Sequence, residues 1–223
     1  MVTATFRLRK VLMIEWIRFK SRKNRVFHLV NQNKVLKVFP EASLAEKEWR
    51  VLRQALERGV PVPKPLRLRK EQLWMEYIAG ANLCDYLNAC LDEKLIPTLS
   101  GWFVAFHRHA GQRHGDANLR NFILAGEKIY GVDFEETAPG DSILDLVQFA
   151  CSVLDTEPMF TAAKYRFCQQ FLCAYEEQMG TEIERLQFWQ QVADLLRRKI
   201  AFRPEQALIL KEEAIKIMNG KIV

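Results

Sequence analysis

The sequence lacks the features that mark membrane, secreted and cysteine-rich metal proteins. Its apolar runs all fall short of the roughly 18–20 residues that a membrane-spanning helix needs. The N-terminus is basic but has no sustained apolar stretch before a cleavage site, so we expect no signal peptide. The cysteines include no Cys-x-x-Cys pair, which argues against a zinc site and structural disulfides. We therefore expect a cytoplasmic protein with reduced thiols.

Charge is unevenly distributed along the chain. The net charge is +6, and the excess is local, because Glu15 is the only acidic residue before residue 26. Such a basic segment is either a solvated face or a contact for nucleotide phosphates, an anionic acceptor, nucleic acid or a peripheral membrane surface. Of these partners, nucleic acid is the one we expect least. Residues 127–157, in contrast, are acidic.

The order of the predicted elements indicates an α+β protein with two lobes. Short β-branched runs predict strands, and apolar residues spaced three to four apart predict helices. The first part should hold strands at 11–17, 26–30, 35–39, 66–68 and 73–78, and a helix at 43–58. The second part should hold helices at 83–91, 99–110, 142–154, 160–178, 182–199 and 204–218. We therefore predict an antiparallel-sheet N-lobe with one helix at residues 1–79 and a mostly helical C-lobe at 80–223, forming one domain.

The most informative stretch is His114-Gly-Asp116, followed by Asn121 and Asp133. Asn121 opens an apolar run, a turn follows at 125–127, and a second strand returns. We expect this hairpin to bring Asp133 opposite Asn121, so that two oxygen ligands suited to Mg²⁺ meet at one end. Asp116 should lie close to the same end. An acceptor-activating aspartate beside an Asn and an Asp that hold Mg²⁺ is the working core of phosphoryl transfer.

Two charged residues interrupt otherwise apolar patterns in the first lobe. Lys37 lies in an apolar strand, and Glu48 lies on the apolar stripe of the following helix. A buried ammonium needs an anionic partner, and a Lys37–Glu48 pair satisfies both residues. Such a pair positions ATP phosphates in kinases. The alternative is an edge-strand lysine and a glutamate that reaches solvent.

The histidines and Asp145 have structural and functional interpretations. We do not expect His107, His109 and His114 to bind metal, because no Cys or carboxylate pattern accompanies them. His107 should pack at a helix end, and His114 should brace the catalytic loop. Asp145 either completes a capping box with Ser142 or reaches the catalytic-loop backbone and supports it.

Taken together, these motifs resemble the aminoglycoside phosphotransferase and choline kinase group of the protein-kinase-like superfamily. The resemblance rests on His114-Gly-Asp116-x4-Asn121, Val132-Asp-Phe-Glu135 and Gly140-Asp-Ser-Ile-Leu-Asp145, and it extends to Trp74-Met-Glu76-Tyr-Ile78. It covers residues 35–146 and implies a bilobal kinase-like fold with ATP and Mg²⁺ in the cleft.

The resemblance also implies a role for each matched residue. Asp116 would be the catalytic base, and Asn121 and Asp133 the ligands of Mg²⁺. Lys37 would contact the ATP phosphates and Glu48 would position it. The backbone of Glu76 and Ile78 would bind adenine, with Met75 at the back of the pocket. His114 and Asp145 would support the catalytic loop.

One departure and three functional interpretations accompany the resemblance. The loop Ser21–Asn24 has no glycine where the family has a phosphate loop, so Arg22 or Lys23 would substitute as cations. The first interpretation is an ATP- and Mg²⁺-dependent phosphotransferase acting on a hydroxyl of a small molecule. The alternatives are a small atypical protein kinase or lipopolysaccharide or lipid-glycan kinase, and a catalytically dead nucleotide-binding scaffold. The eleven residues between Asp133 and Asp145 leave no room for a long peptide-docking segment, which favours the first.

Overall fold

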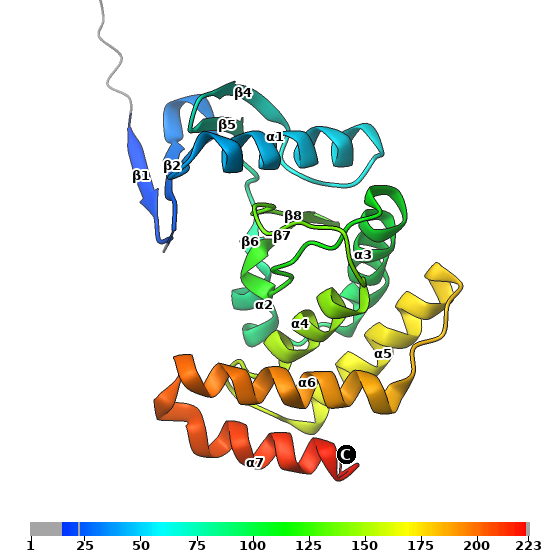
Figure 1. Ribbon diagram of the computed structural model, residues 1–223. Helices are drawn as coiled ribbons and strands as arrows, with labels where there is room; N and C mark the ends of the chain where they lie inside the picture. Colours follow the sequence, from blue (N-terminus) through cyan, green and yellow to red (C-terminus); the bar gives the residue numbers. More distant parts are fainter. Residues whose placement is uncertain (1–14, 22, 222–223) are drawn as a thin grey trace, which may run out of the picture.

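The computed structural model describes residues 15–21 and 23–221 and arranges them in two lobes (Figure 1). The N-lobe is a five-stranded sheet with one long helix beside it. The C-lobe is mostly helical and carries a three-stranded sheet on the side that faces the N-lobe. The predicted α+β class with two lobes is confirmed. The boundary between residues 79 and 80 stays a prediction.

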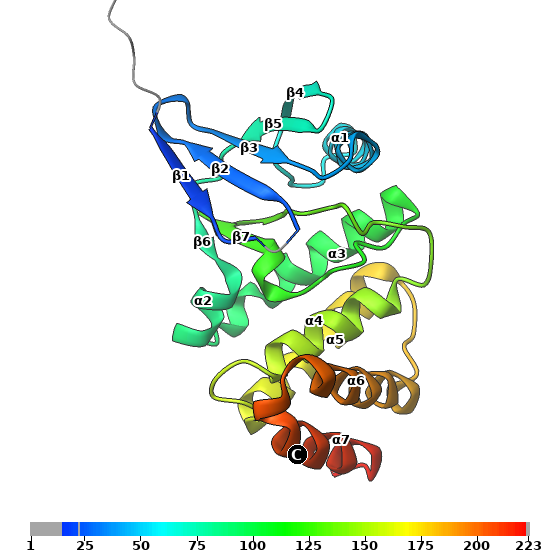
Figure 2. The same ribbon diagram turned by 60° about the vertical axis from the view of Figure 1, so that its left-hand side comes forward.

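The N-lobe sheet is antiparallel, in the order β1-β2-β3-β5-β4. Its elements are β1 (Trp16–Phe19), β2 (Arg25–Leu29), β3 (Lys34–Val38), α1 (Ala42–Glu57), β4 (Pro65–Arg69) and β5 (Gln72–Glu76). Figure 2 shows α1 nearly end-on beside this sheet. The strand predicted at 11–17 instead spans Trp16–Phe19 within the described residues, and its predicted first part lies outside them.

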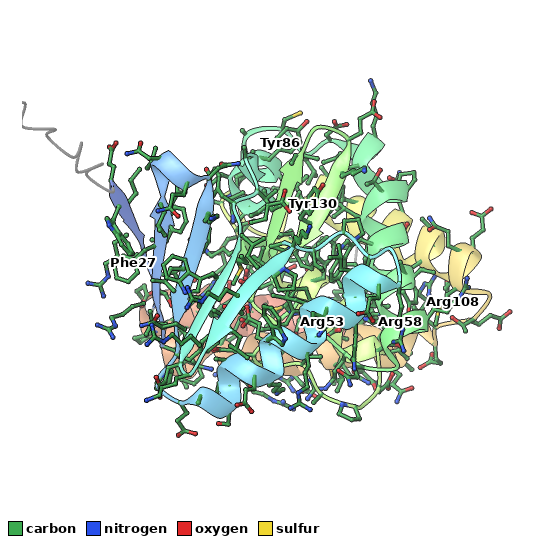
Figure 3. All side chains as sticks on the ribbon, turned by 90° about the horizontal axis from the view of Figure 1, so that it is seen from above. Phe27, Arg53, Arg58, Tyr86, Arg108 and Tyr130 are labelled. Atoms are coloured by element: carbon green, nitrogen blue, oxygen red, sulfur yellow. The ribbon has the colours of Figure 1, made fainter. Side chains whose placement is uncertain are left out.

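Register determines which N-lobe side chains face the C-lobe, across the region between the two lobes that is called the cleft below. Lys37 is opposite Val26 on one neighbouring strand and Leu73 on the other. Directly opposed residues share a face of a sheet, so these side chains lie together on the face that α1 approaches. The other face carries Phe27, which is labelled in Figure 3, and the centroid of its ring lies 5.7 Å from that of Trp16. Lys37 therefore lies on the inner face, toward the C-lobe.

The C-lobe packs its helices around an aromatic core. Its elements are β6 (Ala81–Asn82), α2 (Leu83–Ala89), α3 (Ile96–Ala110), β7 (Phe122–Ala125), β8 (Lys128–Gly131), α4 (Ile143–Leu154), α5 (Ala162–Met179), α6 (Arg185–Lys199) and α7 (Ala207–Met218). Phe103, Phe122 and Phe149 are fully buried and in mutual ring contact. This core lies directly under the β7–β8 hairpin, which makes the hairpin a rigid platform. Among the described helices, none is long and apolar enough to cross a membrane.

The hairpin register differs by one residue from the prediction. Phe122 pairs with Gly131, and Val132 N–H donates to the carbonyl of Asn121 at 2.9 Å. Asp133 therefore lies one residue beyond the position opposite Asn121. The turn is shorter than predicted, because Gly126 adopts a positive φ of 61° and allows a two-residue connection.

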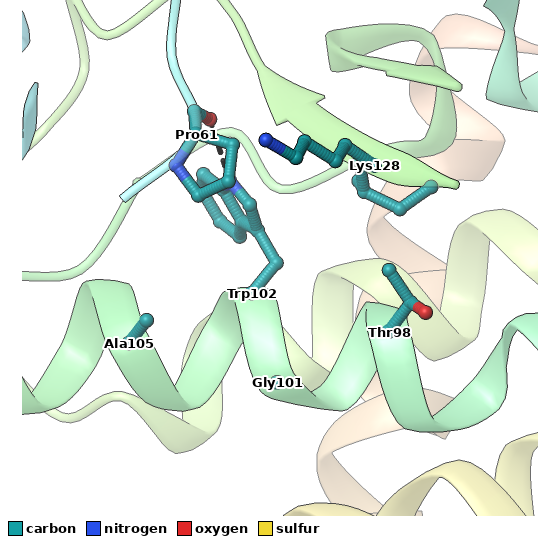
Figure 4. A pocket seen from close by; sticks show the side chains of 7 residues that line it. Pro61, Thr98, Gly101, Trp102, Ala105 and Lys128 are labelled. Atoms are coloured by element: carbon teal, nitrogen blue, oxygen red, sulfur yellow. Dashed lines mark hydrogen bonds between the residues drawn. The ribbon is translucent and has the colours of Figure 1, made fainter. Parts of the chain in front are cut away.

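Hydrogen bonds to Pro61 join the two lobes. The carbonyl of Pro61, in the loop after α1, accepts hydrogen bonds from Trp102 Nε1 at 2.9 Å and from Gly131 N–H at 3.2 Å. Gly131 has no space for a side chain, because an added Cβ would lie 2.2 Å from the Trp102 ring. A pocket of about 210 Å³ lies beside this contact (Figure 4). None of the predicted site residues lines it, so it is not the predicted nucleotide site.

Candidate active site

Lys37 is the centre of the ion-pair network in the cleft. Its Nζ donates to Glu48 Oε2 at 2.7 Å and to Asp133 Oδ1 at 2.5 Å. Lys37 and Glu48 are buried, and Asp133 is partly exposed. The structure thus brings together the two charged residues that interrupted apolar patterns in the sequence. It also connects them to the predicted metal ligand across the cleft.

Burial and charge act in opposite directions at Lys37. Burial alone would lower the pKa of the ammonium, but the carboxylates of Glu48 and Asp133 outweigh it and raise the pKa above its ordinary value. Lys37 is therefore a fixed positive charge at neutral pH. Burial also raises the pKa of Glu48, and the charge of Lys37 opposes that rise. Each buried charge thus stabilises the other, and the pair presents the ammonium of Lys37 in a fixed position suited to binding phosphates.

Asp116 is held between two amide side chains. Its Oδ1 accepts from Asn118 Nδ2 at 2.7 Å, and its Oδ2 accepts from Asn121 Nδ2 at 2.9 Å. Asn121 Nδ2 also donates to the carbonyl of Asp116 at 2.8 Å. Since the amide nitrogen of Asn121 is used in this way, its oxygen is the atom left to bind a metal ion. Sequence reasoning missed Asn118, which is held in place as the residue preceding a short 3-10 helix, Leu119–Asn121.

Asp133 follows β8 in an unusual backbone conformation. Its φ is +68°, in the left-handed region that few residues other than glycine, asparagine and aspartate adopt. Strained backbone of this kind often lies at functional sites.

The catalytic loop needs glycine at position 115: the φ of Gly115 is +84°, and an added Cβ would lie 2.3 Å from the carbonyl oxygen of Glu136. The catalytic loop and the segment after Asp133 are thus packed directly against each other.

One face of α4 supports the catalytic loop. The carboxylate of Asp145 accepts from His114 N–H at 2.5 Å and Gly115 N–H at 2.9 Å. Gln148 accepts from Ala117 N–H at 2.9 Å and donates to the carbonyl of Gly115 at 3.0 Å. Ser142 makes no side-chain cap bond, so of the two interpretations of Asp145 the geometry matches contact with the loop.

The brace extends further into the C-lobe than the sequence indicated. Ser152, one turn beyond Gln148, accepts from Leu119 N–H at 3.1 Å. His107 does more than pack at a helix end, because its Nε2 donates to Asp145 and its Nδ1 lies 3.0 Å from the Tyr175 hydroxyl. The side chain of His109 lies outside the described part of the structure. The buried chain from Tyr175 through Asp145 fixes the loop that carries Asp116.

His114 is a buried neutral brace. Its Nε2 donates to the carbonyl of Val132 at 3.1 Å, so Nδ1 is left to accept from Asp116 N–H at 3.3 Å. Burial lowers the pKa of this imidazole below its ordinary value, and the neighbouring aspartates only partly oppose the effect. Protonation of Nδ1 would also remove the bond from Asp116.

We expect His114 to make the folded protein sensitive to acid. The unfolded chain takes up a proton at about pH 6.5, whereas buried His114 does not, so the unfolded state binds more protons below that pH. The free energy of unfolding should therefore fall as pH drops below about 6.5. Thermal melts between pH 7.5 and 5 should show a smaller decrease for His114→Gln than for the wild type. Equal slopes for both proteins would contradict this assignment.

The predicted adenine site lies where β5 ends. Met75 is opposite Val35 and is buried on the same face as Lys37. Glu76 N–H donates to the carbonyl of Lys64 at 2.9 Å. Ile78 is buried, and no backbone acceptor for its N–H occurs among the described residues. The adenine contacts assigned to Glu76 and Ile78 therefore stay a prediction that this geometry permits.

Three carboxylates converge in the cleft, those of Glu48, Asp133 and Glu135. They do not form an empty metal site, because Lys37 Nζ lies among them and contacts Glu135 Oε2 at 3.8 Å as well.

Of the two cations expected to replace the loop glycine, Arg22 lies outside the described residues. Lys23 pairs with Glu136 and lies 3.6 Å from Glu135 Oε1. The Mg²⁺ ligands predicted from the sequence, Asn121 and Asp133, both lie at the end of the hairpin nearest Asp116.

Comparison with known proteins extends this picture. A family model described as the RIO domain matches residues 3–141. The serine/threonine-protein kinase RIO2 of Caenorhabditis elegans is 34% identical over 93 residues, which are 41% of this chain and 17% of that protein. The structure of amicoumacin kinase has a TM-score of 0.68 at 12% identity and covers 92% of this chain and 88% of its own. A choline/ethanolamine kinase family protein from Mesorhizobium loti has a TM-score of 0.65 at 15% identity, with 94% and 90% covered.

The two-lobed fold, with Lys37 and Glu48 above the cleft and the Asp116 loop below it, defines a protein of the protein-kinase-like class. Because the RIO domain model covers more than half of the chain, the chain belongs to the RIO domain family. The resemblance found in the sequence is therefore right about the superfamily, but the family is RIO rather than aminoglycoside phosphotransferase. The motifs that carried it serve a catalytic geometry common to the superfamily, so they do not separate its families. The chain spans less than a fifth of the length of the Caenorhabditis elegans relative.

Proposed function

We propose that this chain is an ATP- and Mg²⁺-dependent phosphotransferase that acts on a hydroxyl group of a protein, as a small atypical protein kinase. The observation that carries the proposal is the placement of Asp116, Asn121, Asp133 and Lys37 around one cleft. Lys37 offers a fixed positive charge for phosphates, and the oxygens of Asn121 and Asp133 suit Mg²⁺. A protein acceptor is supported by membership of the RIO family and by the relative named as a serine/threonine-protein kinase.

Each residue has a role in this proposal. Asp116, fixed by its two asparagines, would accept a hydrogen bond from the acceptor hydroxyl and align its oxygen with the γ-phosphorus. Asn121 and Asp133 would hold Mg²⁺ against the nucleotide phosphates. Mg²⁺, when bound, would neutralise charge that develops on the phosphoryl oxygens. Glu48 would keep Lys37 aimed at the phosphates.

A small-molecule hydroxyl is the second candidate acceptor, and one observation favours it. Asp133 is followed so closely by α4, which begins at Ile143, that no long peptide-docking segment fits between them. The fold is also shared over nearly the full length of proteins named as an amicoumacin kinase and a choline/ethanolamine kinase family protein.

The proposal predicts transfer of label from γ-³²P-ATP in the presence of Mg²⁺. We expect phosphoserine or phosphothreonine on the chain itself or on a serine/threonine peptide library, and no label when EDTA replaces Mg²⁺. A parallel panel of aminoglycosides, amino alcohols and sugars tests the second candidate. If only small molecules are labelled, the acceptor is a small-molecule hydroxyl and not a protein. Nucleotide binding without label on any acceptor would favour a nucleotide-binding scaffold.

A further inference from the structure

The loop between β1 and β2 is tied to the segment that follows Asp133. Asn24 Nδ2 donates to Glu135 Oε2 at 2.6 Å, and the two residues are only 5% and 8% exposed. A hydrogen bond to a buried carboxylate is stronger than one between neutral groups. The same loop stands where kinases of this class have glycine, and it contains none. The position of this loop is therefore set by a side-chain contact across the cleft.

Among the described residues, the bond to Glu135 is the only hydrogen bond that the side chain of Asn24 makes, and its backbone N–H donates to Ser21 Oγ at 3.3 Å. Its Oδ1 is buried and has no hydrogen-bond partner there. Lys23, next to it, is held differently: its side chain is 64% exposed and pairs with Glu136 at the surface. Exposed ion pairs contribute little and exchange readily. Lys23 can therefore exchange the carboxylates of Glu135 and Glu136 for phosphates, whereas Asn24 stays fixed.

Glu135 is itself fixed from the other elements of the N-lobe. Lys47, on α1, donates from Nζ to the backbone carbonyl of Glu135 at 2.7 Å. Lys37, on β3, lies 3.8 Å from its carboxylate. The loop, the strand and the helix that surround the cleft thus meet at one residue, two positions after the predicted metal ligand. A carboxylate that is itself held in place can fix the position of the loop between β1 and β2 next to the cleft.

We propose that Glu135 is a positioning residue for nucleotide phosphates, which anchors the glycine-free loop through Asn24 and so presents Lys23 to the phosphates. The inference rests on the proposed function, since it assumes that a nucleotide occupies the cleft. Glycine loops bring backbone N–H groups close to phosphates. A loop without glycine approaches less closely and relies on a side-chain cation, which is effective only if the loop is held in place.

The affinity test uses calorimetry with Mg²⁺ and the non-hydrolysable analogue AMP-PNP, so no acceptor is needed. Loss of a hydrogen bond to a charged group should raise Kd about tenfold or more in Glu135→Ala and in Asn24→Ala. Glu135→Gln keeps an oxygen that accepts from Asn24 and should stay within about threefold of the wild type. Lys20→Ala, an exposed lysine just before the loop, is the matched control and should leave Kd unchanged.

Two further measurements separate this role from a general loss of structure. Amide hydrogen exchange of residues 21–25 in the nucleotide-free protein should accelerate in Glu135→Ala and Asn24→Ala but not in Glu135→Gln. The double variant of Asn24 and Glu135 should bind no more weakly than either single variant, because both changes remove the same bond. If the effects of the two changes on Kd add instead, Glu135 acts independently of Asn24, as it would through Lys37, and the proposal is wrong.

The failure of this role is distinguishable from failure of the proposed function. If the wild type binds nucleotide and Glu135→Ala changes neither its Kd nor the exchange of the loop, the role is wrong and the proposed function stands. If the wild type binds no nucleotide at all, both are wrong.

Discussion

Replacing Asp116 by asparagine should lower kcat by about 10²–10⁴-fold, the usual contribution of a positioned acid–base group. This loss corresponds to about 3–5 kcal/mol of transition-state stabilisation. The carboxylate would accept a hydrogen bond from the acceptor hydroxyl, and asparagine keeps its shape but has neither its charge nor its basicity. Nucleotide affinity should survive, because Asp116 is placed for the acceptor rather than for the phosphates. Turnover and AMP-PNP affinity should be measured on one purified sample.

Two details of the site refine the Asp116→Asn experiment. Asparagine has a single side-chain oxygen, so only one of the bonds from Asn118 and Asn121 keeps its side-chain acceptor, although Asn121 Nδ2 still donates to the backbone carbonyl of residue 116. A moderate fall in Mg²⁺ affinity would therefore come from Asn121 and not from Asp116 itself. Asp194→Asn, an exposed change on α6, is a matched control and should leave turnover intact. Undiminished turnover in Asp116→Asn would remove this residue as the base.

The parts of the site that the sequence predicted are those where charge breaks a periodic apolar pattern. Lys37 on an apolar strand and Glu48 on an apolar helical stripe each required a partner, and the structure pairs them at 2.7 Å. The catalytic loop was recognisable because Asp116, Asn121 and Asp133 lie close together in the chain. Local spacing carries this information directly.

The parts that were missed depend on contacts between distant segments. Asn24 and Glu135 are 111 residues apart, and neither interrupts a pattern that would announce a partner. The signal for Gln148 and Ser152 was present: they fall three and seven residues after Asp145 in an otherwise apolar helix, on one helical face. The start of α3 could also have been placed earlier, because Pro97 favours the first turn of a helix.

Hairpin register shows a different limit. One residue more or less in the connection moves every residue of the returning strand by one position relative to its partner. The prediction therefore placed Asp133 in the right region and one residue from its actual register. The positive φ of Asp133 could not have been predicted either, because it depends on the packing of the segment that follows.

Removing the charge of Asp133 should abolish Mg²⁺-dependent turnover, with a loss on the order of 10³-fold or more, since metal-ion charge stabilisation is worth several kcal/mol. Asparagine is the informative replacement, because it tolerates the positive φ at this position. Alanine there would add backbone strain and obscure the result. Raising the Mg²⁺ concentration should recover only part of the activity, because a neutral amide oxygen is a weaker ligand than a carboxylate.

The fold should survive the Asp133→Asn change, and this is what makes the test decisive. Lys37 keeps its buried partner Glu48 at 2.7 Å, so no unpaired charge is left in the interior. The thermal midpoint should stay close to that of the wild type, and nucleotide should still bind weakly without Mg²⁺ through Lys37. A variant that melts normally and turns over at the wild-type rate would show that Asp133 does not hold the metal. A variant that loses both Mg²⁺-dependent turnover and Mg²⁺-dependent tightening of AMP-PNP binding, while it melts normally, places the metal at Asp133.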